Sequence, residues 1–126
     1  MTENGKINNF TDLNAWEKAH ELVIFVYELT RAFPKEEIYG VTSQLRRAAA
    51  SVTANIAEGF SRYHYKEKNN FYYIARGSLG ETENFVYIAK DLQYLSEPEF
   101  KKALGLCEET KKILNGLIRS AKKMDS

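Results

Sequence analysis

The sequence predicts an all-α fold, an antiparallel up-down-up-down four-helix bundle. Apolar residues recur at three- and four-residue spacing in four segments, and no segment shows a convincing strand pattern. The links between these segments are short, which makes consecutive helices antiparallel neighbours. A chain of 126 residues is one domain long. We expect the bundle to occupy residues 12–123, after a flexible N-terminal segment at 1–11.

The first helix is expected at about residues 12–33. Its apolar face follows alternating three- and four-residue steps through Trp16, Ala19, Val23, Val26, Thr30 and Phe33. Asp12 is a plausible N-cap, because a carboxylate can accept the free N–H groups of a first turn. Pro34 ends the helix, since proline disfavours helical geometry in the residue before it.

The second helix is expected at about residues 42–60. Thr42 or Ser43 can cap its start, and Gly59 is a natural stop. Its alanine-rich sequence favours helix and allows another helix to approach closely.

The third and fourth helices are expected at about residues 65–95 and 97–122. The third is apolar on more than one side, which predicts either a central position or packing against another subunit. Ser96 can cap the fourth helix, whose first turn is acidic.

Composition narrows the functional classes. The formal net charge is only +1, so the whole chain gives no strong case for a nucleic-acid or membrane partner. A single cysteine, Cys107, fits a reducing compartment. No apolar run approaches the ~20 residues of a membrane span, and a cytoplasmic protein is expected.

No residue set predicts catalysis, a metal site or a cofactor. Glu17 and His20 match only half of a di-iron bundle motif, which needs the same motif on a second helix. Cys107 lies on an apolar seam without a nearby cation to activate it, which predicts an inert core thiol.

Basic residues gather in the middle of the chain. Between Thr42 and Arg76 six basic residues face only two acidic ones, a local net charge of +4. Cations hold phosphates and tyrosine rings can stack on unpaired bases. The candidate nucleic-acid-binding residues are Arg46, Arg47, Arg62, Tyr63, Lys66, Lys68 and Arg76.

Each half of this basic segment also has a structural interpretation. Arg47 is expected at the level of Glu28 and Glu81, where an ion pair would fix the helix register. The cations of the second turn can equally form a solvated loop.

Small residues are predicted to mark a close helix contact, within the subunit or between subunits: Ala49, Ala57, Gly77 and Ser78.

Several blocks, in order along most of the chain, match a known pattern. They are Trp16-Glu-Lys-Ala19, Phe33-Pro-Lys-Glu-Glu-Ile-Tyr-Gly40, Thr42-Ser-Gln-Leu-Arg-Arg-Ala48, Ser51-Val52, Asn55-Ile-Ala-Glu-Gly59, and Ile74-Ala-Arg-Gly-Ser-Leu79 with Glu81. The chain resembles the bacterial four-helix-bundle proteins encoded in intervening sequences of large-subunit ribosomal RNA genes. It resembles accessory proteins of diversity-generating retroelements more distantly. Thr53 departs from the pattern, which often has proline there, and Gly80 is unusual inside a helix.

The resemblance implies a bundle that assembles as a homopentamer, with RNA or a reverse transcriptase as partner and no established catalysis. The family-motif residues in this chain are Gln44, Arg47, Asn55, Glu58, Gly59, Gly77, Ser78 and Glu81. Two functional hypotheses follow. The first is a non-enzymatic oligomer that binds RNA through basic residues around the second turn. The alternative is a scaffold or accessory subunit that recruits a partner protein.

Overall fold

The computed structural model describes residues 6–125, which form four α-helices and no strand. The helices are α1 (Asn14–Thr30), α2 (Val41–Ser61), α3 (Tyr65–Asp91) and α4 (Glu97–Asp125). Two short 3-10 helices precede α1 and α2, namely η1 (Phe10–Asp12) and η2 (Lys35–Glu37). Residues 1–5 of the segment expected to be flexible lie outside the described residues.

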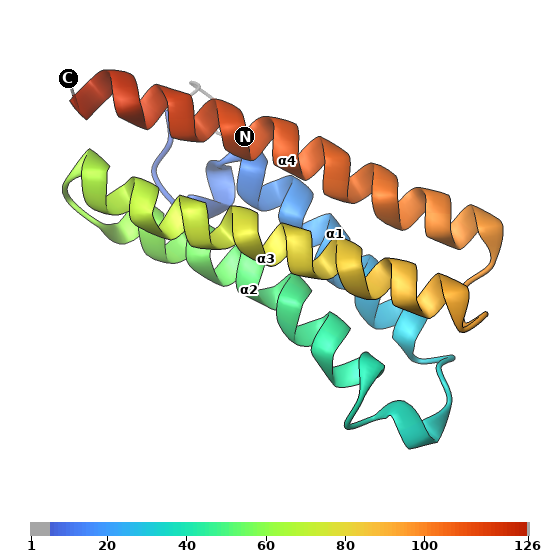
Figure 1. The fold of residues 1–126 in the computed structure, drawn as a ribbon. Helices are drawn as coiled ribbons and strands as arrows, with labels where there is room; N and C mark the ends of the chain where they lie inside the picture. Colours follow the sequence, from blue (N-terminus) through green and yellow to red (C-terminus); the bar gives the residue numbers. More distant parts are fainter. Residues whose placement is uncertain (1–5, 126) are drawn as a thin grey trace.

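The four helices form the predicted antiparallel bundle (Figure 1). Each helix packs against two others, in the ring α1–α2–α3–α4. The first and third links lie at one end of the bundle and the second link lies at the other (Figure 1). The core contains fully buried aliphatic side chains from every helix, such as Leu22, Leu45, Leu79 and Leu114. None of the described helices is both long enough and apolar enough to cross a membrane.

The start of α1 differs from the prediction that Asp12 caps it. Leu13 occupies the N-cap position and makes no side-chain cap hydrogen bond. The Asp12 carboxylate instead accepts the backbone N–H groups of Asn8 and Asn9, at 3.0 and 3.1 Å. Asp12 therefore belongs to the capping box of η1, which occupies the turn before the helix.

The predicted caps of α2 are also wrong. The helix starts at Val41 after Gly40, and the Val41 N–H donates to Glu37 Oε1 at 3.3 Å. Gly59 does not end the helix, which continues to Ser61. A Cβ atom at Gly59 would lie 2.6 Å from Cε1 of Tyr72, so glycine is needed there for the close approach of α3.

The third helix ends four residues earlier than expected, and the fourth begins with the predicted cap. After Asp91 the chain turns through Gln93, whose φ of 64° is left-handed. Ser96 Oγ accepts the Glu99 N–H at 3.2 Å, and Glu99 Oε1 accepts the Ser96 N–H at 2.8 Å. This reciprocal pair is a capping box, which confirms Ser96 as the cap of α4.

Candidate nucleic-acid interface

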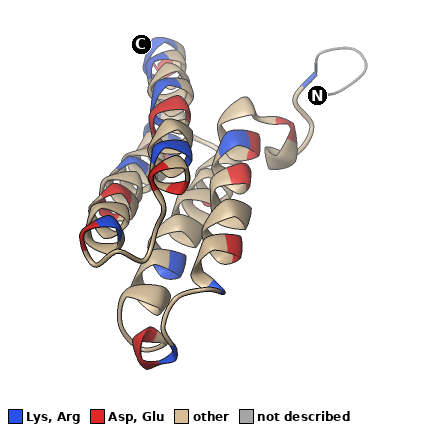
Figure 2. Cartoon of the chain, turned by 90° about the vertical axis from the view of Figure 1, so that its right-hand side faces the viewer, with Lys and Arg blue, Asp and Glu red and all other residues tan. Residues whose placement is uncertain are grey.

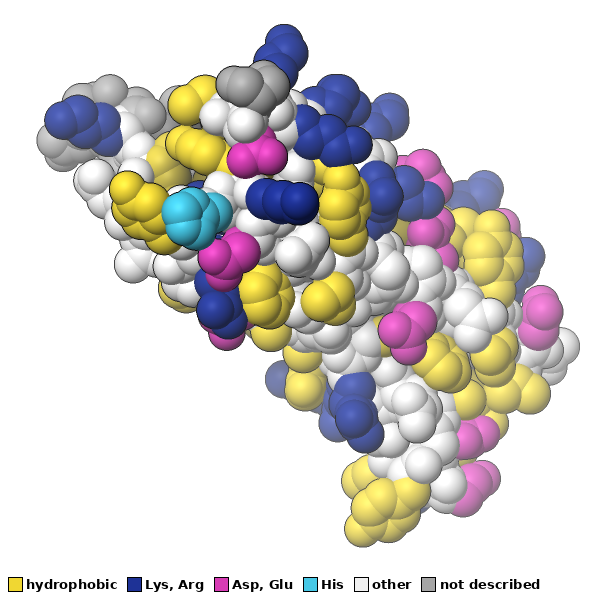
Figure 3. Space-filling model, turned by 60° about the vertical axis from the view of Figure 1, so that its left-hand side comes forward, with side chains coloured by type: hydrophobic (Ala, Val, Ile, Leu, Met, Phe, Trp, Pro, Cys, Tyr) yellow, Lys and Arg dark blue, Asp and Glu magenta, His cyan; other side chains and the backbone are white. Residues whose placement is uncertain are grey.

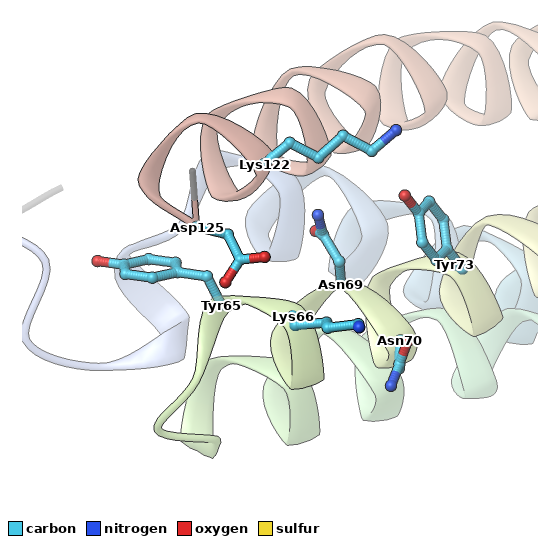
Figure 4. Close-up of a pocket in the computed structure, with 7 residues that line it drawn as sticks. All are labelled: Tyr65, Lys66, Asn69, Asn70, Tyr73, Lys122 and Asp125. Carbon is cyan, nitrogen blue, oxygen red and sulfur yellow. The ribbon is translucent and has the colours of Figure 1, made fainter.

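A hollow of about 250 Å³ lies between the start of α3 and the end of α4. It is lined by Tyr65, Lys66, Asn69, Asn70, Tyr73, Lys122 and Asp125 (Figure 4). Tyr65 and Asp125 lie at one end of the hollow and Tyr73 at the other, with Asn69 between them (Figure 4). The antiparallel course of the two helices brings residues more than fifty positions apart into one site.

Cations surround the exposed ring of Tyr73. The Arg76 guanidinium carbon lies 5.1 Å from the ring centroid, and the Lys122 ammonium lies 5.8 Å from it. Arg76 is also held by a 3.0 Å hydrogen bond from Nη1 to Oδ1 of Asn115. These contacts keep two positive charges over the ring of Tyr73, a residue that is 36% exposed. We call Tyr65, Lys66, Tyr73, Arg76 and Lys122 the α3/α4 basic face.

Asn69 lies against this hollow with an unused acceptor. Its side chain is 6% exposed, and Nδ2 donates to the Ile118 carbonyl at 3.1 Å. Its Oδ1 atom is buried and has no hydrogen-bond partner. The hollow thus combines two lysines and the Asp125 carboxylate with tyrosine rings and amide groups. Its cations and rings suit a ligand that carries phosphates and bases.

Two cations in or near the second link, Arg62 and Lys68, make contacts within the subunit. Arg62 pairs with Glu58 at 3.2 Å and lies over the Phe71 ring at 4.6 Å. Lys68 donates from Nζ to the Phe60 carbonyl at 2.7 Å, near the C-terminal end of α2. Burial lowers the pKa of Lys68 from its usual value. Tyr63 is 88% exposed and contacts the ring of His64 edge-on.

Arg46 and Arg47 lie near the other end of α2 and have different surroundings. Arg46 Nε donates to Thr30 Oγ1 at 2.7 Å, and its guanidinium lies 4.8 Å from the centroid of the Tyr27 ring. Arg47 is exposed beside a polar hollow that Glu81 also lines. Among residues 6–125, no ion pair within 4.0 Å joins Arg47 to Glu28 or Glu81, and the predicted register-fixing ion pair is wrong. Arg47 and Glu81 are both exposed, and solvated side chains gain little free energy from forming an ion pair.

Among the family-motif residues, Gly59 and Ser78 contact the neighbouring helix across the α2–α3 interface. Asn55 Nδ2 donates to the carbonyl and hydroxyl oxygens of Ser51, at 2.8 and 3.0 Å. The Ser51 hydroxyl is 2.8 Å from that of Ser78, which links the two helices. Gln44 and Glu81 line the same polar hollow as Arg47. A Cβ atom at Gly77 would meet nothing within 4 Å, so this glycine marks no close contact inside the subunit.

The described residues contain no group of three or more histidine, cysteine, aspartate or glutamate side chains that could hold a metal ion. His20 stacks on Trp16 with 4.6 Å between ring centroids. Burial raises the pKa of the Cys107 thiol to about 12, which keeps it protonated and unreactive near neutral pH.

The structure therefore gathers only part of the predicted set. Lys66 and Arg76 belong to one face, while Arg46 and Arg47 lie toward the far end of α2. Basic side chains gather around hydrophobic ones on this side of the molecule (Figure 3). Three residues of the α3/α4 basic face were not among the candidates predicted from the sequence, namely Tyr65, Tyr73 and Lys122. Lys122 lies in a run of lysine pairs on α4, and only its antiparallel alignment with the start of α3 singles it out.

Comparison with known proteins identifies the family of this chain. The family model described as 23S rRNA-intervening sequence protein matches residues 11–116. A similar solved structure is a crystal structure of a protein of unknown function, from the S23 ribosomal protein family of Bacteroides thetaiotaomicron. It has a TM-score of 0.76 and 20% sequence identity, and the match covers 82% of this chain and 97% of that chain. At this identity the likeness shows the fold alone.

No curated protein matches the sequence. The family match spans nearly all of the bundle and agrees with the sequence blocks that carry the resemblance. The chain belongs to the 23S rRNA-intervening sequence protein family.

Proposed function

We propose that this protein is a non-enzymatic RNA-binding protein that works as a homo-oligomer and binds RNA through its α3/α4 basic face. The observation that carries the proposal is the exposed Tyr73 ring with Arg76 and Lys122 held over it. Cations of this kind bind phosphates, and an accessible aromatic ring stacks on an unpaired base. The family takes its name from 23S rRNA intervening sequences, so a structured rRNA fragment is the first RNA to test.

The outer surface of α3 supports assembly with further copies. Exposed residues at three- and four-residue steps form a stripe along it: Ile74, Gly77, Gly80, Asn84 and Tyr87. We call this the α3 outer stripe. Glycine inside a helix costs about 1 kcal/mol relative to alanine. Neither Gly77 nor Gly80 meets any neighbour within the subunit that would require a glycine. Close approach of a helix from another copy offsets this cost, and the family resemblance makes a pentamer the expected assembly.

Repetition of the basic face around a ring strengthens RNA binding. One α3/α4 basic face offers three cations, which is a weak site by itself. Several faces on one assembly engage one RNA at a high effective concentration.

A pair of matched variants tests the RNA site. Lys66→Ala/Lys122→Ala removes two cations of the basic face, and Lys101→Ala/Lys112→Ala removes two exposed cations elsewhere on α4. Both variants change the net charge by the same amount. We expect only the first to weaken RNA binding, and to reduce the slope of log K against log salt by about 1.4 for a single-stranded contact. An equal loss of RNA affinity in both variants would overturn the assignment of RNA binding to the α3/α4 basic face.

A protein partner, such as a reverse transcriptase, is the second candidate. The first link exposes two apolar side chains, Ile38 and Tyr39, and Tyr39 is 93% exposed. Aromatic side chains of this kind are common anchors in protein interfaces. A partner that is captured from native extract after nuclease treatment, and is lost with Ile38→Ser/Tyr39→Ser, would support this candidate.

A further inference from the structure

A second hollow lies at the first link, near the opposite end of α2 from the second link. Its volume is about 150 Å³, and it is lined by Thr30, Arg31, Phe33, Pro34, Lys35, Ile38, Thr42 and Arg46. All three charged residues in this lining are basic, and no carboxylate lines it. Ligand pockets for drug-sized molecules are about 300 Å³ or more, so this hollow fits one small group.

Arg46 is held in place with part of its hydrogen-bonding capacity unused. Its Nε donates to Thr30 Oγ1 at 2.7 Å, and that hydroxyl donates onward to the Val26 carbonyl at 2.8 Å. The Tyr27 ring supports the guanidinium at 4.8 Å. Among the described residues, no hydrogen bond or ion pair occupies its two Nη groups. A fixed guanidinium with free N–H groups suits a bidentate oxyanion.

Thr42 adds a buried hydroxyl without a partner. The residue is 5% exposed, lines the hollow, and its Oγ1 atom has no hydrogen-bond partner. It precedes Arg46 by four residues, which puts both side chains on the same face of α2. Thr42 also belongs to the first turn of this 21-residue helix, where the helix dipole favours negative charge.

Glu37, one of two glutamates in the first link, is engaged by other groups. Glu37 Oε2 accepts the Tyr94 hydroxyl at 2.7 Å, and Oε1 accepts the Val41 N–H at 3.3 Å. Within residues 6–125, Glu37 makes no ion pair within 4.0 Å with any of the three cations that line the hollow. Figure 2 shows acidic and basic segments next to each other in this link, at the lower end of the view.

We propose that this hollow is a binding site for a single phosphate group, held by Arg46 and Thr42 with Arg31 and Lys35 at its rim. The small volume leaves the rest of the ligand outside, so the phosphate belongs to inorganic phosphate, a terminal nucleotide phosphate or an RNA backbone. The site is separate from the α3/α4 basic face and does not depend on the RNA-binding function proposed for that face.

The test is a calorimetric titration of the full chain with inorganic phosphate. Arg46→Gln and Thr42→Val should each weaken phosphate binding about tenfold or more, because each removes a hydrogen bond to a charged ligand. Arg47→Gln is the matched control, since Arg47 is the next residue and lies outside the hollow, and it should leave the affinity unchanged. Thr42→Val keeps the side-chain volume, so it stays informative if Arg46→Gln does not fold.

Three further arms separate the sources of the phosphate and the two proposed sites. If a short 5′-phosphorylated oligonucleotide displaces inorganic phosphate and its hydroxyl-ended form does not, the natural ligand of the hollow is a terminal phosphate. If both oligonucleotides displace inorganic phosphate equally well, the ligand of the hollow is a phosphate of the RNA backbone. Phosphate binding that is unchanged in Lys66→Ala/Lys122→Ala shows that this site is independent of the basic face. Absence of phosphate binding to the wild type, or equal binding by the wild type and Thr42→Val, would overturn the proposal.

Discussion

Gly59 is a residue at which α3 lies too close to α2 for a Cβ atom. An added Cβ would lie 2.6 Å from the Tyr72 ring and 3.0 Å from the Lys68 carbonyl oxygen. Gly59→Ala should therefore lower the free energy of unfolding by about 1–3 kcal/mol, because neither the buried ring nor the backbone can move aside cheaply. Urea unfolding measures this change.

Gly77→Ala is the control for that experiment. The added methyl group at Gly77 meets nothing within 4 Å, and alanine has the higher helix propensity. This variant should raise the stability of the subunit by up to about 1 kcal/mol. A similar loss of stability in both variants would contradict the close contact at Gly59.

Cys107 should make stability depend on pH in the alkaline range. Burial raises its pKa from 9.0 to about 12, so between these values the thiol ionises in the unfolded chain but not in the folded one. The unfolded state then binds fewer protons, and the free energy of unfolding falls as pH rises.

Cys107→Ala isolates this effect. The variant leaves a cavity and should be less stable than the wild type at pH 8. By pH 10 the difference in the free energy of unfolding should narrow by about 1 kcal/mol, since the variant has no thiol to ionise. Chemical denaturation at the two pH values measures both proteins, and a constant difference would contradict the buried, protonated thiol.

Single-residue roles were the least predictable part of the sequence. An α-helix turns by roughly 100° per residue, so Arg46 and Arg47 point in very different directions. Arg46 contacts Thr30 and Tyr27, while Arg47 forms no ion pair with Glu28 or Glu81 among the described residues. The sequence could not show this, because the outcome depends on the rotation and height of neighbouring helices.

The sequence was sufficient to predict that the four helices exist, but not the residues at which they begin and end. Long apolar periodicity predicted all four helices, because burial of one face dominates helix stability in a bundle. Helix ends depend on single hydrogen bonds. Ser96 forms the predicted cap of α4. Asp12 instead belongs to the capping box of η1, and the Glu37 carboxylate, rather than Thr42, accepts a backbone N–H at the start of α2.

The capping box of α4 can be tested directly. Ser96→Ala removes the acceptor of the Glu99 N–H and should lower the free energy of unfolding by about 1 kcal/mol. Ser120→Ala is a matched control, because Ser120 is exposed near the other end of the same helix. Thermal or urea unfolding compares the two, and equal stabilities would argue that the cap contributes nothing.

The α3 outer stripe predicts how the subunit assembles. Gly77→Leu should prevent close helix approach between copies and reduce the solution mass toward the 14.5 kDa of one chain. Gly77→Ala should reduce the assembled mass less than Gly77→Leu does, since a methyl group is smaller. Light scattering after gel filtration measures both variants. A leucine variant with wild-type mass would place the interface elsewhere, and a monomeric wild type would contradict assembly itself.

The whole molecule has two basic sites, near opposite ends of the bundle. Charge patterning predicted the positive middle of the chain, and the fold divides it between the α3/α4 basic face and the first link. Lys122 could not be assigned from its neighbours in sequence, because its relation to Tyr73 exists only after α4 has folded back along α3. The fold was thus predictable from sequence, and the site only in part.

The most direct test of the central claim is the affinity of the wild-type protein for a structured rRNA fragment across a salt series, measured by fluorescence anisotropy. Log K should fall linearly with log salt. A slope steeper than about −2.7 would exceed what the three cations of one basic face can supply even to a duplex region, as binding by several copies requires. Absence of binding at about 50 mM salt, or an affinity independent of salt, would contradict RNA binding through this face.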